Sequence, residues 1–125
     1  GATALVIVTP LTPETRGLIG EPELAALAPG AVVIDVSRGG VTDLDALVEA
    51  LEVGQIAAAA VDVFPTEPLP ADDRLWNTPN LLVTPHTAGN SADYQRRIAS
   101  CFADNLLAFE QGFTPPGKVD RATGY

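Results

Sequence analysis

Four short apolar segments recur along the chain, and each is followed by residues typical of turns. The segments are residues 4–8 (ALVIV), 31–36 (AVVIDV), 57–64 (AAAAVDVF) and 81–83 (LLV). Nearly continuous apolar runs that are rich in Val and Ile are typical of strands buried on both faces of a parallel sheet. The Ala-rich start of the third segment also suits a helix, so the pattern defines the beginning of that strand least well.

Two helical patterns separate the first three segments. Residues 21–28 predict a short helix, with Pro22 near its first position and Pro29 and Gly30 after it. Residues 43–53 predict a clearer amphipathic helix, which Asp43 can cap and Gly54 can end. Its apolar side chains recur at i, i+3, i+4 and i+7, and they are Leu44, Leu47, Val48 and Leu51.

A third and longer helical pattern covers residues 91–111. One face of this helix would carry Tyr94, Ile98, Cys101, Phe102, Asn105 and Phe109. Gly112 follows the pattern, and the residues after it contain Pro and Gly. We therefore expect a long amphipathic helix followed by an extended tail.

The alternation of strands and helices predicts an α/β fold. Strand–helix–strand crossovers are right-handed and give a parallel sheet with helices packed on it. The predicted division places the sheet in residues 1–89 and the long helix with its tail in residues 90–125. Because only four strands are visible and the first begins almost at residue 1, we expect a fragment of a longer chain. Its first strand would present an open apolar edge that favours association.

Composition narrows the functional classes. The chain has 125 residues, 46% hydrophobic and 18% charged, which is typical of a packed domain. Seven basic and sixteen acidic residues give a net charge of −9, which argues against nucleic acid or an anionic membrane as a partner. No apolar run reaches the roughly 18 residues of a membrane span, and the N-terminus does not resemble a signal peptide. A single Cys and a single His argue against a disulfide and against zinc, so we expect a cytoplasmic protein without a metal.

Polar side chains follow each predicted strand. In an open parallel sheet, ligands bind beyond the carboxyl ends of the strands, so these side chains would share one edge. In chain order they are Thr9, Ser37 and Arg38, Asp62 with Glu67 beyond it, and His86.

This set of residues suits hydride transfer to a 2-oxo acid. A planar Arg38 can bind a substrate carboxylate with two hydrogen bonds, which Lys cannot do. His86 can supply the proton that the carbonyl oxygen needs, and Glu67 can orient the ring and favour its charged form. The reverse reaction would use the same His as a base.

Each of these residues also has a purely structural interpretation. Arg38 can be a surface or ion-pair residue, and Pro85–His86 can be a simple turn. Glu67 can be an exposed loop carboxylate, and Asp62 can cap or pair within the fold. The glycine fingerprint of a dinucleotide-binding turn is missing, because no two glycines are separated by one residue.

Taken together, the motifs resemble the D-isomer-specific 2-hydroxyacid dehydrogenase family over nearly the whole chain. The matching segments are residues 9–20 (TPLTPETRGLIG), 30–40 (GAVVIDVSRGG), 43–51 (DLDALVEAL), 60–70 (AVDVFPTEPLP), 75–89 (LWNTPNLLVTPHTAG) and 119–125 (VDRATGY). The resemblance implies that residues 1–89 are the second half of a NAD(P)-binding Rossmann domain. It also implies that residues 90–125 return towards a substrate domain.

The resemblance assigns roles to individual residues. It makes Arg38 the clamp for the substrate carboxylate and pairs Glu67 with the acid/base His86. It implies NAD or NADP as cofactor, a small 2-oxo or 2-hydroxy acid as substrate and a homodimer in the complete protein. The cofactor would be bound by Thr9, Pro10, Val36, Ser37, Arg38, Asp62, His86, Ala88 and Gly89.

Two features depart from the family pattern. Asp35 stands where Asn is more usual, a mild change that leaves the expected mechanism intact. The substrate domain and the phosphate-binding glycine loop have no counterpart in these residues. We therefore expect the isolated chain to bind cofactor weakly and to be inactive.

Two other functions fit the same scaffold. One is a non-enzymatic, NAD(H)-sensing binding protein similar to the C-terminal-binding co-repressors, although this chain has no basic patch. Turnover of glyoxylate or hydroxypyruvate would separate it from an enzyme. The other is a purely structural role, in which the chain is one half of an assembly. The size of such an assembly in solution would not respond to the cofactor.

Overall fold

The computed structural model describes residues 1–122, which form two compact units. The first unit is Gly1–Ala88 and the second begins at Gly89. The division thus lies one residue before the predicted position. None of the helices in residues 1–122 is long and apolar enough to cross a membrane.

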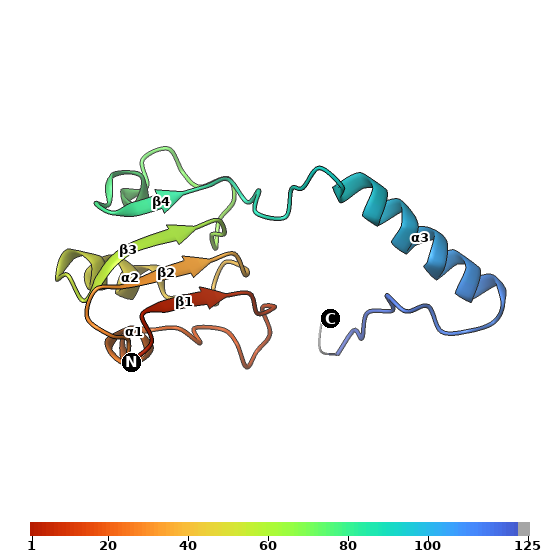
Figure 1. Ribbon diagram of the computed structural model, residues 1–125, viewed down its shortest axis with the longest axis horizontal. Helices are drawn as coiled ribbons and strands as arrows, with labels where there is room; N and C mark the ends of the chain where they lie inside the picture. Colours follow the sequence, from red (N-terminus) through yellow and green to blue (C-terminus); the bar gives the residue numbers. More distant parts are fainter. Residues whose placement is uncertain (123–125) are drawn as a thin grey trace. The chain divides into compact units, whose positions relative to one another are not determined.

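The first unit is built on a four-stranded sheet (Figure 1). Its strands, in chain order and in the order in which they pair, are β1 (Ala4–Ile7), β2 (Ala31–Asp35), β3 (Ile56–Val61) and β4 (Leu81–Val83). All three strand pairs are parallel. The predicted α/β fold with a parallel sheet is therefore confirmed.

The last residues of the four strands are aligned across the sheet. Ile7 pairs with Asp35, Asp35 with Val61, and Val61 with Val83. The loops that follow the strands therefore begin side by side along one edge. This register determines which polar side chains can meet.

The helices of the first unit form where the apolar spacing predicts them. Helix α1 (Glu21–Ala25) is shorter than the pattern suggested, and α2 spans Leu44–Glu52. The Asp43 carboxylate caps α2 by accepting hydrogen bonds from the backbone N–H groups of Asp45 and Ala46, at 3.0 and 3.2 Å. A short 3-10 turn, η1 (Arg74–Asn77), precedes β4.

One hydrophobic core joins these helices to the sheet. Its buried side chains include Leu24 from α1, Leu47 and Leu51 from α2, and Val33 and Val61 from the central strands. These core positions alternate along the strands with positions on the other face, as the two-residue period of a strand requires.

The sheet is covered on one face only within residues 1–88, which differs from the predicted burial of both faces. The chain always steps in the same direction from β1 to β4, and right-handed crossovers then place every connection on the same face. On the opposite face Val6 remains 55% exposed and Leu82 62% exposed. The apolar run alone could not reveal which helices are present to cover it.

The second unit contains α3 (Tyr94–Glu110), which matches the long predicted helix and begins three residues later. Gly112, with φ of +76°, follows its end. No side chain of α3 is buried. The tail from residue 113 to residue 122 contains turns but no helix or strand, and residues 123–125 of the last matching segment lie outside the described residues.

Candidate active site

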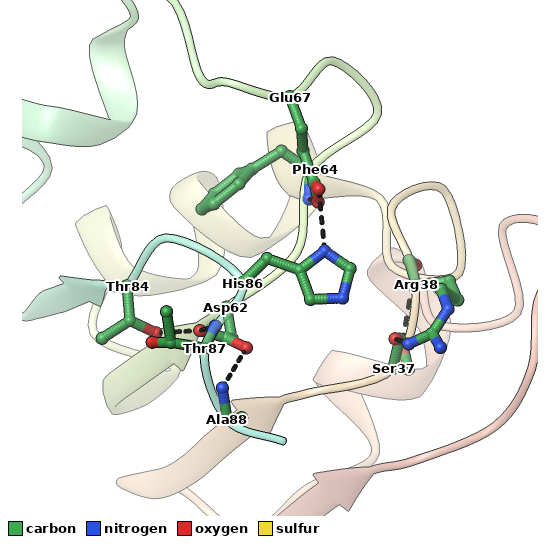
Figure 2. A network of polar contacts seen from close by, with 9 residues as sticks. All are labelled: Ser37, Arg38, Asp62, Phe64, Glu67, Thr84, His86, Thr87 and Ala88. Atoms are coloured by element: carbon green, nitrogen blue, oxygen red, sulfur yellow. Dashed lines mark hydrogen bonds and ion pairs between the residues drawn. The ribbon is translucent and has the colours of Figure 1, made fainter. Parts of the chain in front are cut away.

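Four loops that carry the predicted polar residues leave the same edge of the sheet. Thr9 follows β1, Ser37 and Arg38 follow β2, Asp62 and Glu67 follow β3, and His86 follows β4. Because the strand ends are in register, the loops after β2, β3 and β4 are neighbours (Figure 2). These loops bring together the side chains that were predicted to act together.

His86 and Glu67 form a hydrogen-bonded pair. Nδ1 of His86 lies 2.7 Å from Oε2 of Glu67, and the two side chains are 42% and 35% exposed. An ionised carboxylate only accepts, so Nδ1 donates this hydrogen bond. The ring is thereby held with Nε2 turned away from Glu67, to the side on which Figure 2 shows Arg38.

Glu67 uses its second oxygen to hold its own loop. Oε1 accepts a hydrogen bond of 2.9 Å from the backbone N–H of Phe64. The hydrogen bond from His86, the one from Phe64 and the charge of His86 together lower the pKa of Glu67, against smaller opposing effects of burial and of Asp62. Glu67 is therefore a carboxylate at neutral pH.

The turn that carries His86 is fixed by Asp62 at the end of β3. The Asp62 carboxylate accepts hydrogen bonds from Oγ1 of Thr84 at 2.5 Å and from the backbone N–H groups of Thr87 and Ala88 at 2.9 and 2.8 Å. His86 itself has φ of +53°, a region that a non-glycine residue occupies only when its surroundings impose it. Asp62 supplies that constraint.

The environment of Asp62 acts on its charge in two directions. Burial alone would raise the pKa of this carboxyl group. The hydrogen bonds from Thr84, Ala88 and Thr87 and the charge of His86 outweigh burial, so the pKa of Asp62 is lowered. Asp62 is thus an anion whose oxygens already hold the His86 turn.

Arg38 lies at the exposed tip of its loop. Nη1 donates a hydrogen bond of 2.6 Å to the carbonyl oxygen of Ser37, and no carboxylate among residues 1–122 pairs with the guanidinium. The next residue, Gly39, packs directly against the loop of Glu67, because a Cβ at Gly39 would lie 2.0 Å from the carbonyl oxygen of Phe64. This close approach brings the Arg38 loop against the segment that carries Glu67.

The residues expected to bind the cofactor are distributed along the same edge. Oγ1 of Thr9 is buried and has no hydrogen-bond partner in the described residues. Buried hydroxyls are rarely left unpaired in proteins, so Thr9 is suited to bind a polar ligand such as a dinucleotide. The other predicted cofactor contacts in the first unit are Pro10, Val36, Ser37, Arg38, Asp62, His86 and Ala88, and Gly89 is the first residue of the second unit.

A separate hollow of about 760 Å³ lies next to this edge, beside the start of α2. Its walls include Arg16, Asp43, Phe64 and Arg74, but not Arg38, Glu67 or His86. The volume of this hollow therefore does not identify the candidate site, which is defined instead by its hydrogen-bonded side chains.

Sequence reasoning missed several residues that support the site. Thr42 donates a hydrogen bond to Asp35 at the base of the Arg38 loop, and Thr84 donates one to Asp62. Gly39 packs against Phe64 in the loop of Glu67. Asp35 interrupts an apolar strand pattern, and that interruption was the available signal. The contact made by Gly39 depends on how two loops pack, which no local pattern encodes.

Comparison with known proteins identifies the family of this chain. The family profile for the D-isomer specific 2-hydroxyacid dehydrogenase, NAD binding domain, matches residues 1–88. Glyoxylate/hydroxypyruvate reductase A of Serratia proteamaculans is 43% identical over 125 residues, which cover 100% of this chain and 39% of that protein. Glyoxylate reductase of Aeropyrum pernix is 45% identical over 117 residues, covering 94% of this chain and 35% of that protein. The chain thus spans little more than a third of these relatives.

Solved structures show the same fold. A D-isomer specific 2-hydroxyacid dehydrogenase from Xanthobacter autotrophicus, in complex with NADPH and MES, is 44% identical with a TM-score of 0.88, covering 100% of this chain and 51% of that one. An NADPH-dependent glyoxylate/hydroxypyruvate reductase from Sinorhizobium meliloti, in complex with NADP and sulfate, is 34% identical with a TM-score of 0.87. The match covers 98% of this chain and 40% of that one. The chain therefore belongs to the D-isomer-specific 2-hydroxyacid dehydrogenase family, with its first 88 residues matching the NAD-binding domain.

Proposed function

We propose that the full-length protein is an oxidoreductase that transfers a hydride between NAD(P)H and a 2-oxo acid, with a D-2-hydroxy acid as product. The observation that carries this proposal is the 2.7 Å hydrogen bond between His86 and Glu67 at the edge where Arg38 is exposed. A proton donor, a group that orients it and a carboxylate binder are the protein groups that this reaction requires.

In this mechanism Arg38 binds the substrate carboxylate. Its guanidinium has no ionic partner among the described residues, so its remaining N–H groups are available to a ligand. A planar guanidinium matches a carboxylate with two parallel hydrogen bonds, which fixes the orientation of the substrate as well as its position. The oxo group next to that carboxylate would then be presented to His86.

His86 supplies the proton. When bound, a nicotinamide cofactor would supply the hydride for the carbonyl carbon. Negative charge then develops on the carbonyl oxygen, and Nε2 of the protonated ring donates a proton to that oxygen. Glu67 keeps the ring oriented throughout by its hydrogen bond to Nδ1. In the reverse reaction the neutral ring removes the proton from the hydroxyl group.

The predicted cofactor contacts remain part of this proposal. The unpaired Oγ1 of Thr9 and the loop of Ser37 and Arg38 lie at the ends of adjacent strands, as a dinucleotide site at a sheet edge requires. Glyoxylate and hydroxypyruvate are the substrates to test first, because reductases of these names are among the relatives.

The test uses the full-length protein and a single substitution, His86→Ala. We expect the wild type to oxidise NADPH or NADH in the presence of glyoxylate or hydroxypyruvate. The variant should lose turnover by roughly 100-fold or more, as expected when a general acid is removed. Its affinity for NADPH, followed by fluorescence, should fall by a much smaller factor than turnover, because the other predicted cofactor contacts remain. Turnover that is unchanged by the substitution would remove His86 from the mechanism.

A further inference from the structure

A buried carboxylate that the mechanism above does not use lies at the end of β2. Asp35 is 1% exposed, and none of the ion pairs of residues 1–122 includes it. Burying a carboxylate without an opposite charge is costly unless its oxygens accept several hydrogen bonds. The hydrogen-bond partners of Asp35 therefore indicate the role of its carboxylate.

Both oxygens of Asp35 are used, and they bind opposite ends of one loop. Oδ1 accepts hydrogen bonds from the backbone N–H and from Oγ of Ser37, at 2.9 and 2.5 Å. Oδ2 accepts a hydrogen bond of 2.6 Å from Oγ1 of Thr42. Ser37 and Thr42 are themselves 2% and 3% exposed. One carboxylate thus closes the loop of residues 37–42 at its base, and Arg38 is in that loop.

The rest of the loop is tied down in the same way, except at its tip. The backbone N–H of Val41 donates to the carbonyl oxygen of Arg38 at 3.1 Å, and Gly39 packs against Phe64. The backbone N–H of Asp62 donates to the carbonyl oxygen of Asp35 at 2.9 Å, which joins the base of the loop to β3. The guanidinium of Arg38 is held to this frame by one hydrogen bond to the carbonyl oxygen of Ser37, and the residue is otherwise exposed.

We propose that Asp35 is a positioning residue that holds the Arg38 loop in the form that receives a substrate carboxylate. This inference rests on the proposed function. Asp35 is too deeply buried to touch a substrate, so its effect must pass through Ser37, Thr42 and the loop between them. Three donors converge on the two oxygens of Asp35, and an ionised carboxylate can accept from all of them at once.

The chemistry of the side chain gives two complementary substitutions. Asp35→Ala removes both acceptor oxygens, so Ser37 and Thr42 lose their shared partner. Thr42→Val keeps the shape of the Thr side chain but removes the hydroxyl that reaches Oδ2. The first change loosens both ends of the loop, and the second loosens one end.

The experiment is a double-mutant cycle in the full-length protein, with glyoxylate as substrate. We expect Thr42→Val to raise KM by about threefold to tenfold, the scale of one lost hydrogen bond, and Asp35→Ala to raise it at least as much. Because Ser37 is also a predicted cofactor contact, the affinity for NADPH serves as a comparison and should fall by a smaller factor than the affinity for glyoxylate. In an Arg38→Ala background neither substitution should raise KM further, because the group that the loop positions is gone. Asp72→Ala, which removes the same charge at an exposed site, is the matched control and should have no effect.

Three results would overturn this inference. One is an equal rise of KM in the wild-type and Arg38→Ala backgrounds, and another is a loss of NADPH affinity as large as the rise of KM. The third is an unchanged KM in Thr42→Val, which carries the test even if circular dichroism shows Asp35→Ala to be unfolded. If Arg38→Ala alone leaves KM and kcat unchanged, the proposed function fails instead. The two failures are therefore distinguishable.

Discussion

At Asp62, a single buried carboxylate accepts three hydrogen bonds from the turn that carries His86. The family resemblance placed Asp62 among the residues expected to bind the cofactor. Its present partners show that it also determines the backbone on which His86 is mounted, including the positive φ of that residue. One side chain can thus support both cofactor and acid/base geometry.

The lowered pKa of Asp62 leads to a prediction about stability and pH. A carboxyl group whose pKa is lower in the folded than in the unfolded chain stabilises the fold above its ordinary range, and this contribution is lost as pH falls through the folded value. Asp62→Asn should therefore lower the free energy of unfolding at neutral pH by about 1–3 kcal/mol, the cost of breaking a buried hydrogen-bonded carboxylate. The difference from the wild type should shrink at about pH 3, below the ordinary carboxyl range.

Urea unfolding of the 125-residue chain at the two pH values measures this difference. Glu52→Gln, on the exposed face of α2, is the control and should be close to neutral at both. A penalty for Asp62→Asn that grows as pH falls would contradict the assignment of Asp62 as a stabilising anion.

The sequence pointed to the polar residues that the structure gathers at this edge and suggested that Glu67 orients His86, but it could not establish their contact. The polar residues that follow each apolar run pointed to Arg38, Glu67 and His86, because parallel strands end at one edge. The hydrogen bond between Glu67 and His86 joins two loops 19 residues apart, so its existence depends on loop geometry that no periodic pattern records. The resemblance to a family supplied that pairing as an expectation.

At the scale of strands and loops, the sheet acts as an aligned base for the site. The strands end in register, so each loop begins at the same level, and Gly39 allows two of these loops to touch. The spacing between the Arg38 and Glu67 loops therefore depends on the absence of a Cβ at one position.

Gly39→Ala tests this dependence. The added methyl group would lie 2.0 Å from a backbone oxygen, so the two loops must move apart. We expect kcat/KM of the full-length protein for glyoxylate to fall on the order of 100-fold, because a shift of about 1 Å at a reacting group has effects of that size. Gly20→Ala is the matched control, since its Cβ would approach no atom closer than 3.7 Å and its φ is −124°. Full activity of Gly39→Ala would show that the contact is not needed.

The elements themselves were predicted well where a local rule applies. Helix α2 begins after Asp43 and is buried along Leu47, Val48 and Leu51, as its spacing and cap indicated. Helix α1 ends earlier than its apolar pattern, near the Pro29 that limits it. The bounds of β4 match the prediction, and those of β1, β2 and β3 differ by one to three residues. Strand β3 ends before Asp62, whose carboxylate holds the turn of His86.

At the scale of the whole molecule, the side chains of the described residues that form the core all belong to the first unit. Each buried apolar side chain lies before residue 76, and α3 buries none. The sequence predicted a sheet covered on both faces. Whether helices cover the second face depends on the direction of every crossover, which the apolar pattern of a single strand does not record. Residues 1–88 step in one direction only, so they cover one face.

The most direct test of the proposed chemistry compares the pH dependence of the reaction in its two directions. In the full-length protein, reduction of glyoxylate should slow as pH rises, because it requires the protonated ring of His86. Oxidation of the 2-hydroxy acid should slow as pH falls, because it requires the neutral ring. In His86→Gln the remaining slow reaction should lose both opposite dependences. Opposite pH dependences that persist in the variant would contradict the assignment of His86 as the group that exchanges the proton.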